Sequence, residues 1–182
     1  MPFPKDHKYT AEEFLELMPD DSSERYELID GDIVALASPG ELHQRILGEV
    51  FAELRNYIRN NMGDCRPFVA PFDVKLDENN VVQPDIMVVC DKDKLDGKRC
   101  NGAPDLVIEI TSSNYARDYI DKLDLYSKSG VREYWIVDPA YKKVLVYFFE
   151  KNQFPSIYTF DTPVPVGIYD NKLLICIGEL ID

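Results

Sequence analysis

The segment from Val81 to Asp138 constrains the fold of this chain more than any other stretch. Its apolar, strand-like runs are separated by a polar loop and by a helix-like segment, and they cover residues 81–89, 106–111 and 131–138. The short apolar run at 106–111 is consistent with a strand in a central position of a sheet.

Two of these runs each hold one acid among apolar neighbours, Asp85 in the first and Glu109 in the second. A carboxylate that is buried without a partner is costly, so such acids usually meet a cation. If the two strands lie side by side, the carboxylates form an oxygen-rich site, to which the backbone carbonyl of Ile110 can add a ligand. Such a site suits a hard divalent cation, Mg²⁺ or Mn²⁺.

The length of 182 residues and the apolar fraction of 45% predict one domain with a sizeable core. We expect the core at about residues 22–150 and a β-rich C-terminal extension at about 151–182. The N-terminus lacks the apolar stretch of a signal peptide, and no run reaches the length of a membrane span. A cytoplasmic protein with no membrane partner is the resulting expectation.

The cysteines argue against a zinc site. No two of them form a CxxC pair, the chain has only two histidines, and the cysteines are Cys65, Cys90, Cys100 and Cys176. Three of them lie in or beside apolar runs, so we predict small buried residues and no structural disulfide.

The net charge of −13 argues against a sequence-independent coat for nucleic acid, because affinity for phosphate is mainly electrostatic. The segment 91–132 nevertheless carries eight acids and eight bases, so it is neutral while the rest of the chain is acidic. One face near the proposed site can therefore be locally positive.

Local patterns predict the remaining elements. Thr10 and Glu13 have the spacing of a capping box, which begins a helix at residues 10–18. Asp30-Gly31 between two apolar runs indicates a hairpin. We also predict a long helix at 41–62, strands at 66–76, 143–149 and 173–177, and a helix cap at 112–114.

Three polar residues have more than one interpretation from spacing alone. Glu27 is either a solvent-facing strand residue, which spacing favours, or a third acid aimed at the site. His43, in the first turn of the long helix, is more simply a hydrogen-bonded residue than a metal ligand. Lys122 shares a helix face with Asp118 and Tyr126, and its simplest interpretation is a surface ion pair with Asp118.

The joint order of several pieces resembles the Uma-two family of restriction-endonuclease-like proteins, in the PD-(D/E)xK superfamily. The matching pieces are YELIDGDIVAL at 26–36, His43-Gln44, QPDIMVV at 83–89, APDLVIEITSSN at 103–114, the set Asp118, Lys122 and Tyr126, and GVREYWIVDP at 130–139. Together they cover most of residues 26–139, and the last forty or so residues match less distinctly.

The resemblance implies an α/β (α+β) fold with a restriction-endonuclease-like core, in which a central mixed β-sheet is flanked by helices. It also implies Mg²⁺-dependent hydrolysis of DNA and a homodimer with the apolar C-terminal tail as its interface. It implies that Asp85 and Glu109 bind metal and that Glu27 is a third carboxylate. The superfamily's lysine would fall two residues after Glu109, where this chain has Thr111, which cannot supply a positive charge. The resemblance places that lysine on the following helix, at Lys122.

We therefore predict a metal-dependent DNA endonuclease whose catalytic residues are Asp85, Glu109, Lys122 and Glu27. One alternative is an inactive binding or dimerisation module, which Thr111 and the negative charge favour. The other is a metal-dependent hydrolase of small phosphoesters, which tolerates an acidic surface better. Cleavage that requires metal and Asp85 would exclude the inactive module, and a substrate panel would separate the two enzymes.

Overall fold

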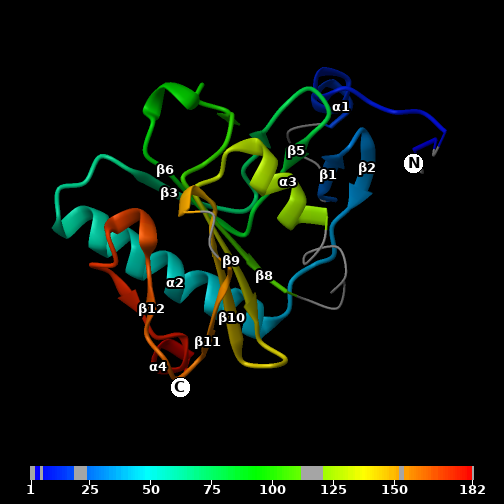
Figure 1. Ribbon diagram of the computed structural model, residues 1–182. Coiled ribbons are helices and arrows are strands. Elements are labelled where there is room, and N and C mark those ends of the chain that lie inside the picture. Colours follow the sequence, from blue (N-terminus) through cyan, green and yellow to red (C-terminus); the bar gives the residue numbers. More distant parts are fainter. Residues whose placement is uncertain (1–2, 5, 19–23, 112–120, 152–153, 182) are drawn as a thin grey trace.

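The computed structural model describes residues 3–4, 6–18, 24–111, 121–151 and 154–181 and has a mixed α/β fold with mixed sheets flanked by helices (Figure 1). The helices are α1 (Ala11–Leu17), α2 (Glu41–Asn60), α3 (Lys122–Ser129) and α4 (Ile177–Ile181), with 3-10 turns η1 (Lys92–Lys94), η3 (Phe149–Lys151) and η4 (Gly167–Tyr169). The strands are β1 (Tyr26–Ile29), β2 (Asp32–Ala35), β3 (Arg66–Val69), β4 (Val74–Lys75), β5 (Val81–Val82), β6 (Ile86–Val89), β7 (Cys100–Asn101), β8 (Leu106–Ile110), β9 (Glu133–Asp138), β10 (Lys143–Phe148), β11 (Ser156–Thr159), β12 (Val164–Pro165) and β13 (Leu174–Ile175).

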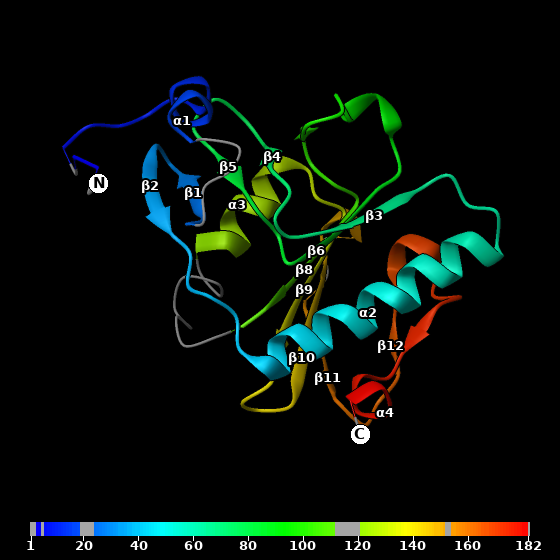
Figure 2. The ribbon, with the colours of Figure 1, turned by 180° about the vertical axis from the view of Figure 1, so that it is seen from behind.

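The central sheet has six strands in the order β11-β10-β9-β8-β6-β3. Its strands are antiparallel except for β8 and β9, which run parallel. Parallel neighbours need a crossover, and α3 lies in the segment that connects these two strands. Figures 1 and 2 show α2 on one side of this sheet and α3 on the other.

Side chains along the central strands alternate between these two helical layers. In β6, Ile86 and Val88 pack in the cluster that contains α2, whereas Met87 and Val89 pack in the cluster that contains α3. Both faces are apolar because both are covered. The same alternation in β8 turns Ile108 toward α2 and therefore turns Glu109 toward α3.

A second sheet has the order β2-β1-β5-β4-β7 and begins with the predicted hairpin. Asp30 and Gly31 have φ angles of 49° and 79°, and both positive values fit the tight turn that Asp-Gly favours. Helix α1 packs Phe14 against Leu28 of this sheet, and its predicted capping box is present. The predicted hairpin and first helix are thus confirmed.

Prolines break two of the predicted strands. The run 66–76 is divided at Pro71 into β3 and β4, which belong to different sheets, and the run 81–89 is divided at Pro84 into β5 and β6. Proline has no N–H to donate to a neighbouring strand, so a ladder of hydrogen bonds stops there. Asp85 lies at the second break, immediately before the central strand β6.

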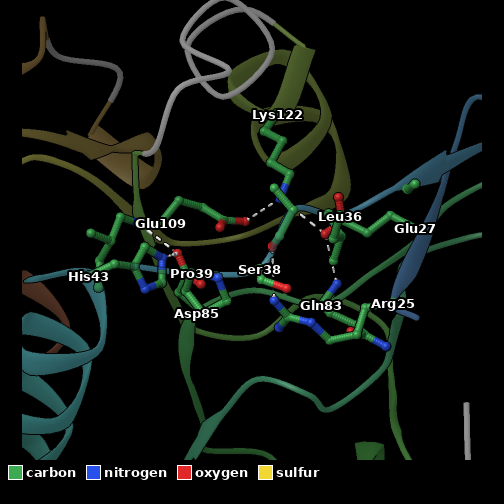
Figure 3. Close-up of a pocket in the computed structure, with 13 residues that line it drawn as sticks. Arg25, Glu27, Leu36, Ser38, Pro39, His43, Gln83, Asp85, Glu109 and Lys122 are labelled. Carbon is green, nitrogen blue, oxygen red and sulfur yellow. Dashed lines mark hydrogen bonds and ion pairs between the residues drawn. The ribbon is translucent and has the colours of Figure 1, made fainter. Parts of the chain in front are cut away.

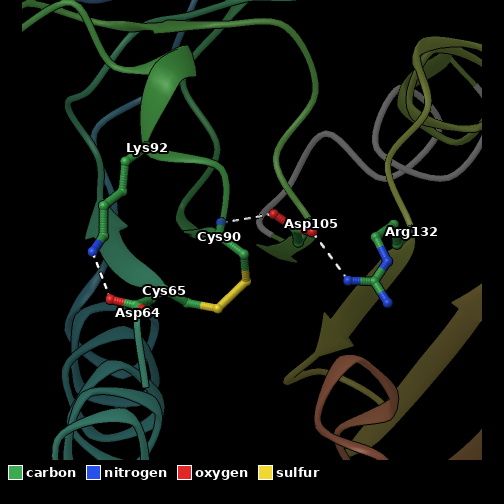
Figure 4. Close-up of a disulfide and its surroundings, with 6 residues drawn as sticks. All are labelled: Asp64, Cys65, Cys90, Lys92, Asp105 and Arg132. Carbon is green, nitrogen blue, oxygen red and sulfur yellow. Dashed lines mark hydrogen bonds and ion pairs between the residues drawn. A yellow bond between two sulfur atoms is a disulfide. The ribbon is translucent and has the colours of Figure 1, made fainter. Parts of the chain in front are cut away.

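The prediction of no disulfide is wrong, because Cys65 and Cys90 are bonded to each other (Figure 4). In the antiparallel pair β3–β6, Arg66 lies opposite Val89, so the two cysteines occupy the next pair of positions. Their sequence separation of 25 gives no hint of this register. The free cysteines are Cys100, which is buried, and Cys176, which is half-buried.

The C-terminal segment packs on the chain itself. Strand β11 extends the central sheet, α4 contacts α2, and the tail residues of the main core are Phe160, Val164, Val166, Leu173, Ile175 and Ile177. The predicted strand 173–177 is too long, because β13 ends at Ile175 and α4 follows. Dimerisation through the tail stays a prediction. The exposed large apolar side chains of the described part of the tail are Phe154, Ile157 and Leu174.

Among the described residues, no helix is long and apolar enough to cross a membrane. The predicted helix cap at 112–114 lies outside the described part of the chain.

Candidate functional site

A polar pocket of about 80 Å³ lies where β1, β8, the start of α2 and α3 meet (Figure 3). Its polar lining includes all four predicted catalytic residues together with Arg25, His43 and Gln83, and Ile110 also lines it. Parts of the chain that are distant in sequence therefore meet at one place.

Lys122 lies between two carboxylates at the wall of this pocket. Its Nζ is 2.8 Å from Oε1 of Glu109 and 3.0 Å from Oε1 of Glu27. Oε1 of Glu109 also accepts a hydrogen bond of 2.8 Å from the hydroxyl of Tyr126. Lys122 is only 4% exposed, so its interpretation as part of a surface ion pair is wrong, and Asp118 lies outside the described residues.

Glu27 is fully buried and faces the site, so the solvent-facing interpretation is wrong. Strand β1 lies between β2 and β5, and the packing of α3 brings Lys122 onto the face that carries Glu27. Oε1 also accepts a hydrogen bond of 2.9 Å from the backbone N–H of Gln83. Oε2 is buried and has no hydrogen-bond partner among the described residues.

Asp85 is held from two sides. Its Oδ2 accepts a hydrogen bond of 2.8 Å from the backbone N–H of Ile110 and lies 3.0 Å from Nε2 of His43. Helix α2 begins at Glu41 and so presents His43 to Asp85 in its first turn. The predicted hydrogen-bonded role of His43 agrees with this geometry, and Nδ1 of the same ring is buried without a partner among the described residues.

Burial changes the acid–base properties of this site. It raises the pKa of Glu109 from 4.5 to about 8, and the carboxylates of Asp85 and Glu27 add to the rise while Lys122 opposes it. Burial also raises the pKa of Tyr126 well above its ordinary value. In the absence of a bound cation, Glu109 therefore holds a proton at neutral pH, and Tyr126 stays a hydrogen-bond donor.

The donor atoms at the pocket suit a hard divalent cation. Asp85 and Glu109 offer carboxylate oxygens, and the buried Oε2 of Glu27 and Oε1 of Gln83 have no partners among the described residues. No group of three or more His, Cys, Asp and Glu side chains in the described part of the chain is arranged to hold a metal ion. Mg²⁺ needs only one or two protein carboxylates because it keeps several waters, so the residues fit it.

Three polar residues of the pocket, Arg25, Ser38 and Gln83, are not predicted from the sequence. Only its place in the QPDIMVV piece marks Gln83, although its backbone N–H donates a hydrogen bond to Glu27 and its side chain donates one of 2.9 Å to Asp73. Arg25 gave no signal beyond its place at the start of a strand, two positions before Glu27. Strand alternation puts residues at this spacing on one face, so the spacing by itself indicates that Arg25 lies on the same face as Glu27.

Comparisons with known proteins agree with the fold. The Uma2 family, described as "Putative restriction endonuclease", matches residues 11–164. A similar solved structure is that of "a putative nuclease belonging to DUF820" from Anabaena variabilis ATCC 29413, with a TM-score of 0.78 and 24% identity over 94% of this chain and 97% of that chain. No curated protein matches the sequence.

Proposed function

Because the chain belongs to the Uma2 family of restriction-endonuclease-like nucleases, we propose that it is a metal-dependent endonuclease that hydrolyses phosphodiester bonds in DNA. The observation that carries this proposal is the convergence of Glu27, Asp85, Glu109 and Lys122 on one pocket. Three acidic side chains there face one ammonium group that is ion-paired to two of them. A divalent cation would replace the proton of Glu109 and compensate the negative charge that this carboxylate then carries.

In this proposal Asp85 and Glu109 hold Mg²⁺ or Mn²⁺, with Glu27 and the carbonyl of Ile110 as further oxygen donors. When bound, such a cation lowers the pKa of water and offsets the charge on a phosphate. Tyr126 fixes the orientation of Glu109 through its hydrogen bond to Oε1.

Three further groups prepare the site for a phosphodiester. The imidazole of His43 and the N–H of Ile110 fix the orientation of Asp85. Lys122 supplies the positive charge that Thr111 lacks, because its Nζ already lies beside Glu109. An ammonium in this place can orient a water molecule or stabilise negative charge on the phosphate. In this proposal the acidic side chains and the ammonium of Lys122 are held in position before the substrate binds.

A plasmid-nicking assay tests this function with Mg²⁺, with Mn²⁺ and with a chelator. We expect the wild-type protein to nick DNA only with metal and the Asp85→Ala variant to lose the activity. Asp93→Ala is the matched control, since it removes the same charge from an exposed acid in η1, outside the pocket. Equal cutting by wild type and Asp85→Ala would refute the assignment of this site.

The two alternative functions give different results in the same experiment. An inactive module would cut nothing under any condition, whereas a hydrolase of small phosphoesters would turn over bis(p-nitrophenyl) phosphate but leave DNA intact. The net charge of −13, which a small phosphoester tolerates better than duplex DNA does, is the observation that keeps the small-substrate enzyme as the second candidate.

A further inference from the structure

Two cationic side chains line the pocket, and they differ in their partners. Lys122 is paired with Glu27 and Glu109. Arg25 forms no ion pair with any acid in the described part of the chain. The guanidinium of Arg25 makes one hydrogen bond among these residues, from Nη2 to the carbonyl oxygen of Ala37, and its length is 3.3 Å.

The fold fixes the direction of Arg25. Its carbonyl oxygen accepts a hydrogen bond of 2.9 Å from the N–H of Leu36, which extends the β1–β2 hairpin by one more pair. Arg25 lies two positions before Glu27, so strand alternation turns both side chains to the same face. Figure 3 shows the Arg25 side chain pointing into the pocket beneath Ser38.

A structural role explains this arrangement poorly. A guanidinium has five N–H donors, and one bond of 3.3 Å to a carbonyl oxygen uses only one of them weakly. Arg25 lines the same pocket as Glu27, Asp85 and Glu109 but forms no ion pair with any of these three acids. The geometry therefore leaves the forked donor set of Arg25 available to a ligand that enters the pocket.

Resting on the proposed nuclease function, we propose that Arg25 is a substrate-binding residue whose guanidinium holds a phosphate of the nucleic-acid backbone. The planar fork of arginine matches two phosphate oxygens at once. A chain with a net charge of −13 repels a polyanion, so a cationic side chain at the pocket would offset this repulsion where the phosphate binds. Lys122 does not serve this purpose alone, because its ammonium is buried and already bonded to Glu27 and Glu109.

The test measures DNA binding rather than cleavage. A fluorescein-labelled DNA duplex is titrated by fluorescence anisotropy in Ca²⁺, which also takes oxygen ligands, across a series of salt concentrations. The variants are Arg25→Gln and Arg25→Lys. The matched control is Arg59→Gln, which removes the same charge from an exposed arginine near the far end of α2. Arg59 is separated from His43 by about 24 Å along the helix axis, at about 1.5 Å per residue.

We expect Arg25→Gln to weaken binding on the order of tenfold and to reduce the slope of log K against log salt by about one. Arg25→Lys is expected to keep the slope and to lose part of the affinity, because it keeps the charge without the fork. Arg25→Gln that binds DNA with the affinity and salt slope of Arg59→Gln would overturn the proposal.

Failure of the proposed function gives a separate result. If the wild-type protein does not bind DNA, the nucleic-acid substrate is refuted, and the role of Arg25 is then read from the KM for bis(p-nitrophenyl) phosphate. A KM raised by Arg25→Gln but not by Arg59→Gln supports phosphate binding by Arg25. Equal KM values for the two variants overturn it.

Discussion

Replacing Glu109 with glutamine is expected to stabilise the metal-free protein at neutral and alkaline pH. Lys122 and Tyr126 both donate to Oε1 of Glu109, and the carbonyl oxygen of glutamine can accept both hydrogen bonds. Lys122 also keeps Glu27 as its counter-charge. The substitution therefore removes one ionisation while it preserves the shape and the donor–acceptor pattern of the site.

The size of the effect follows from the pKa of Glu109, which burial raises from 4.5 to about 8. The unfolded chain releases this proton near the lower value and the folded chain near the higher one. The stability that the proton contributes is thus complete below about pH 4.5 and is lost as the pH rises through about 8. At about 1.4 kcal/mol per pH unit, the difference in unfolding free energy between Glu109→Gln and wild type grows by an amount on the order of 4 kcal/mol from about pH 5 to about pH 8.

Urea unfolding at a series of pH values in a chelating buffer measures this difference, with linear extrapolation to water. Trp135 is the one tryptophan of the chain and is fully buried, so its fluorescence reports unfolding. Glu49→Gln, at an exposed position on α2, controls for the change in net charge. A difference between Glu109→Gln and wild type that stays constant with pH would show that Glu109 is already ionised in the folded protein and would refute the reasoning.

The same variants report on metal binding without any activity measurement. A cation held by Glu109 must displace its proton, so Mg²⁺ is expected to stabilise the wild-type protein more strongly as the pH rises. Glu109→Gln is expected to lose most of this stabilisation.

Two further substitutions test how the site and the sheet are held. Lys122→Met is expected to cost about 3–5 kcal/mol of stability, because it leaves the buried carboxylate of Glu27 without its counter-charge and Glu109 without a hydrogen-bond donor. Lys128→Met, which breaks the exposed pair with Asp124, should cost less than about 1 kcal/mol. Equal losses in thermal or urea unfolding would contradict the buried network. Replacing both Cys65 and Cys90 with serine is expected to cost about 3 kcal/mol, as the entropy of a 25-residue separation implies. Under the same reasoning, a reductant should lower the melting temperature of wild type but leave that of the double variant unchanged.

Local patterns in the sequence were sufficient for most elements of the fold. The capping box at Thr10 and the Asp30-Gly31 turn each depend on residues that are neighbours in the chain, so they formed as predicted. The apolar runs beside Asp85 and around Glu109 likewise identified buried strands, although the first begins only after Asp85. The breaks at Pro71 and Pro84 were less visible, because where a ladder stops depends on which strand is its neighbour.

The sequence by itself determined which residue types the chain can bring to a site, and it placed Glu109 on a buried strand and Asp85 beside one. Only the tertiary structure decided that Glu27 faces inward, that Lys122 lies between two carboxylates and that Cys65 meets Cys90. The reason is physical. Period and propensity act over a few residues, whereas strand register and helix packing bring together side chains that are tens of residues apart and that carry no mark of their partners.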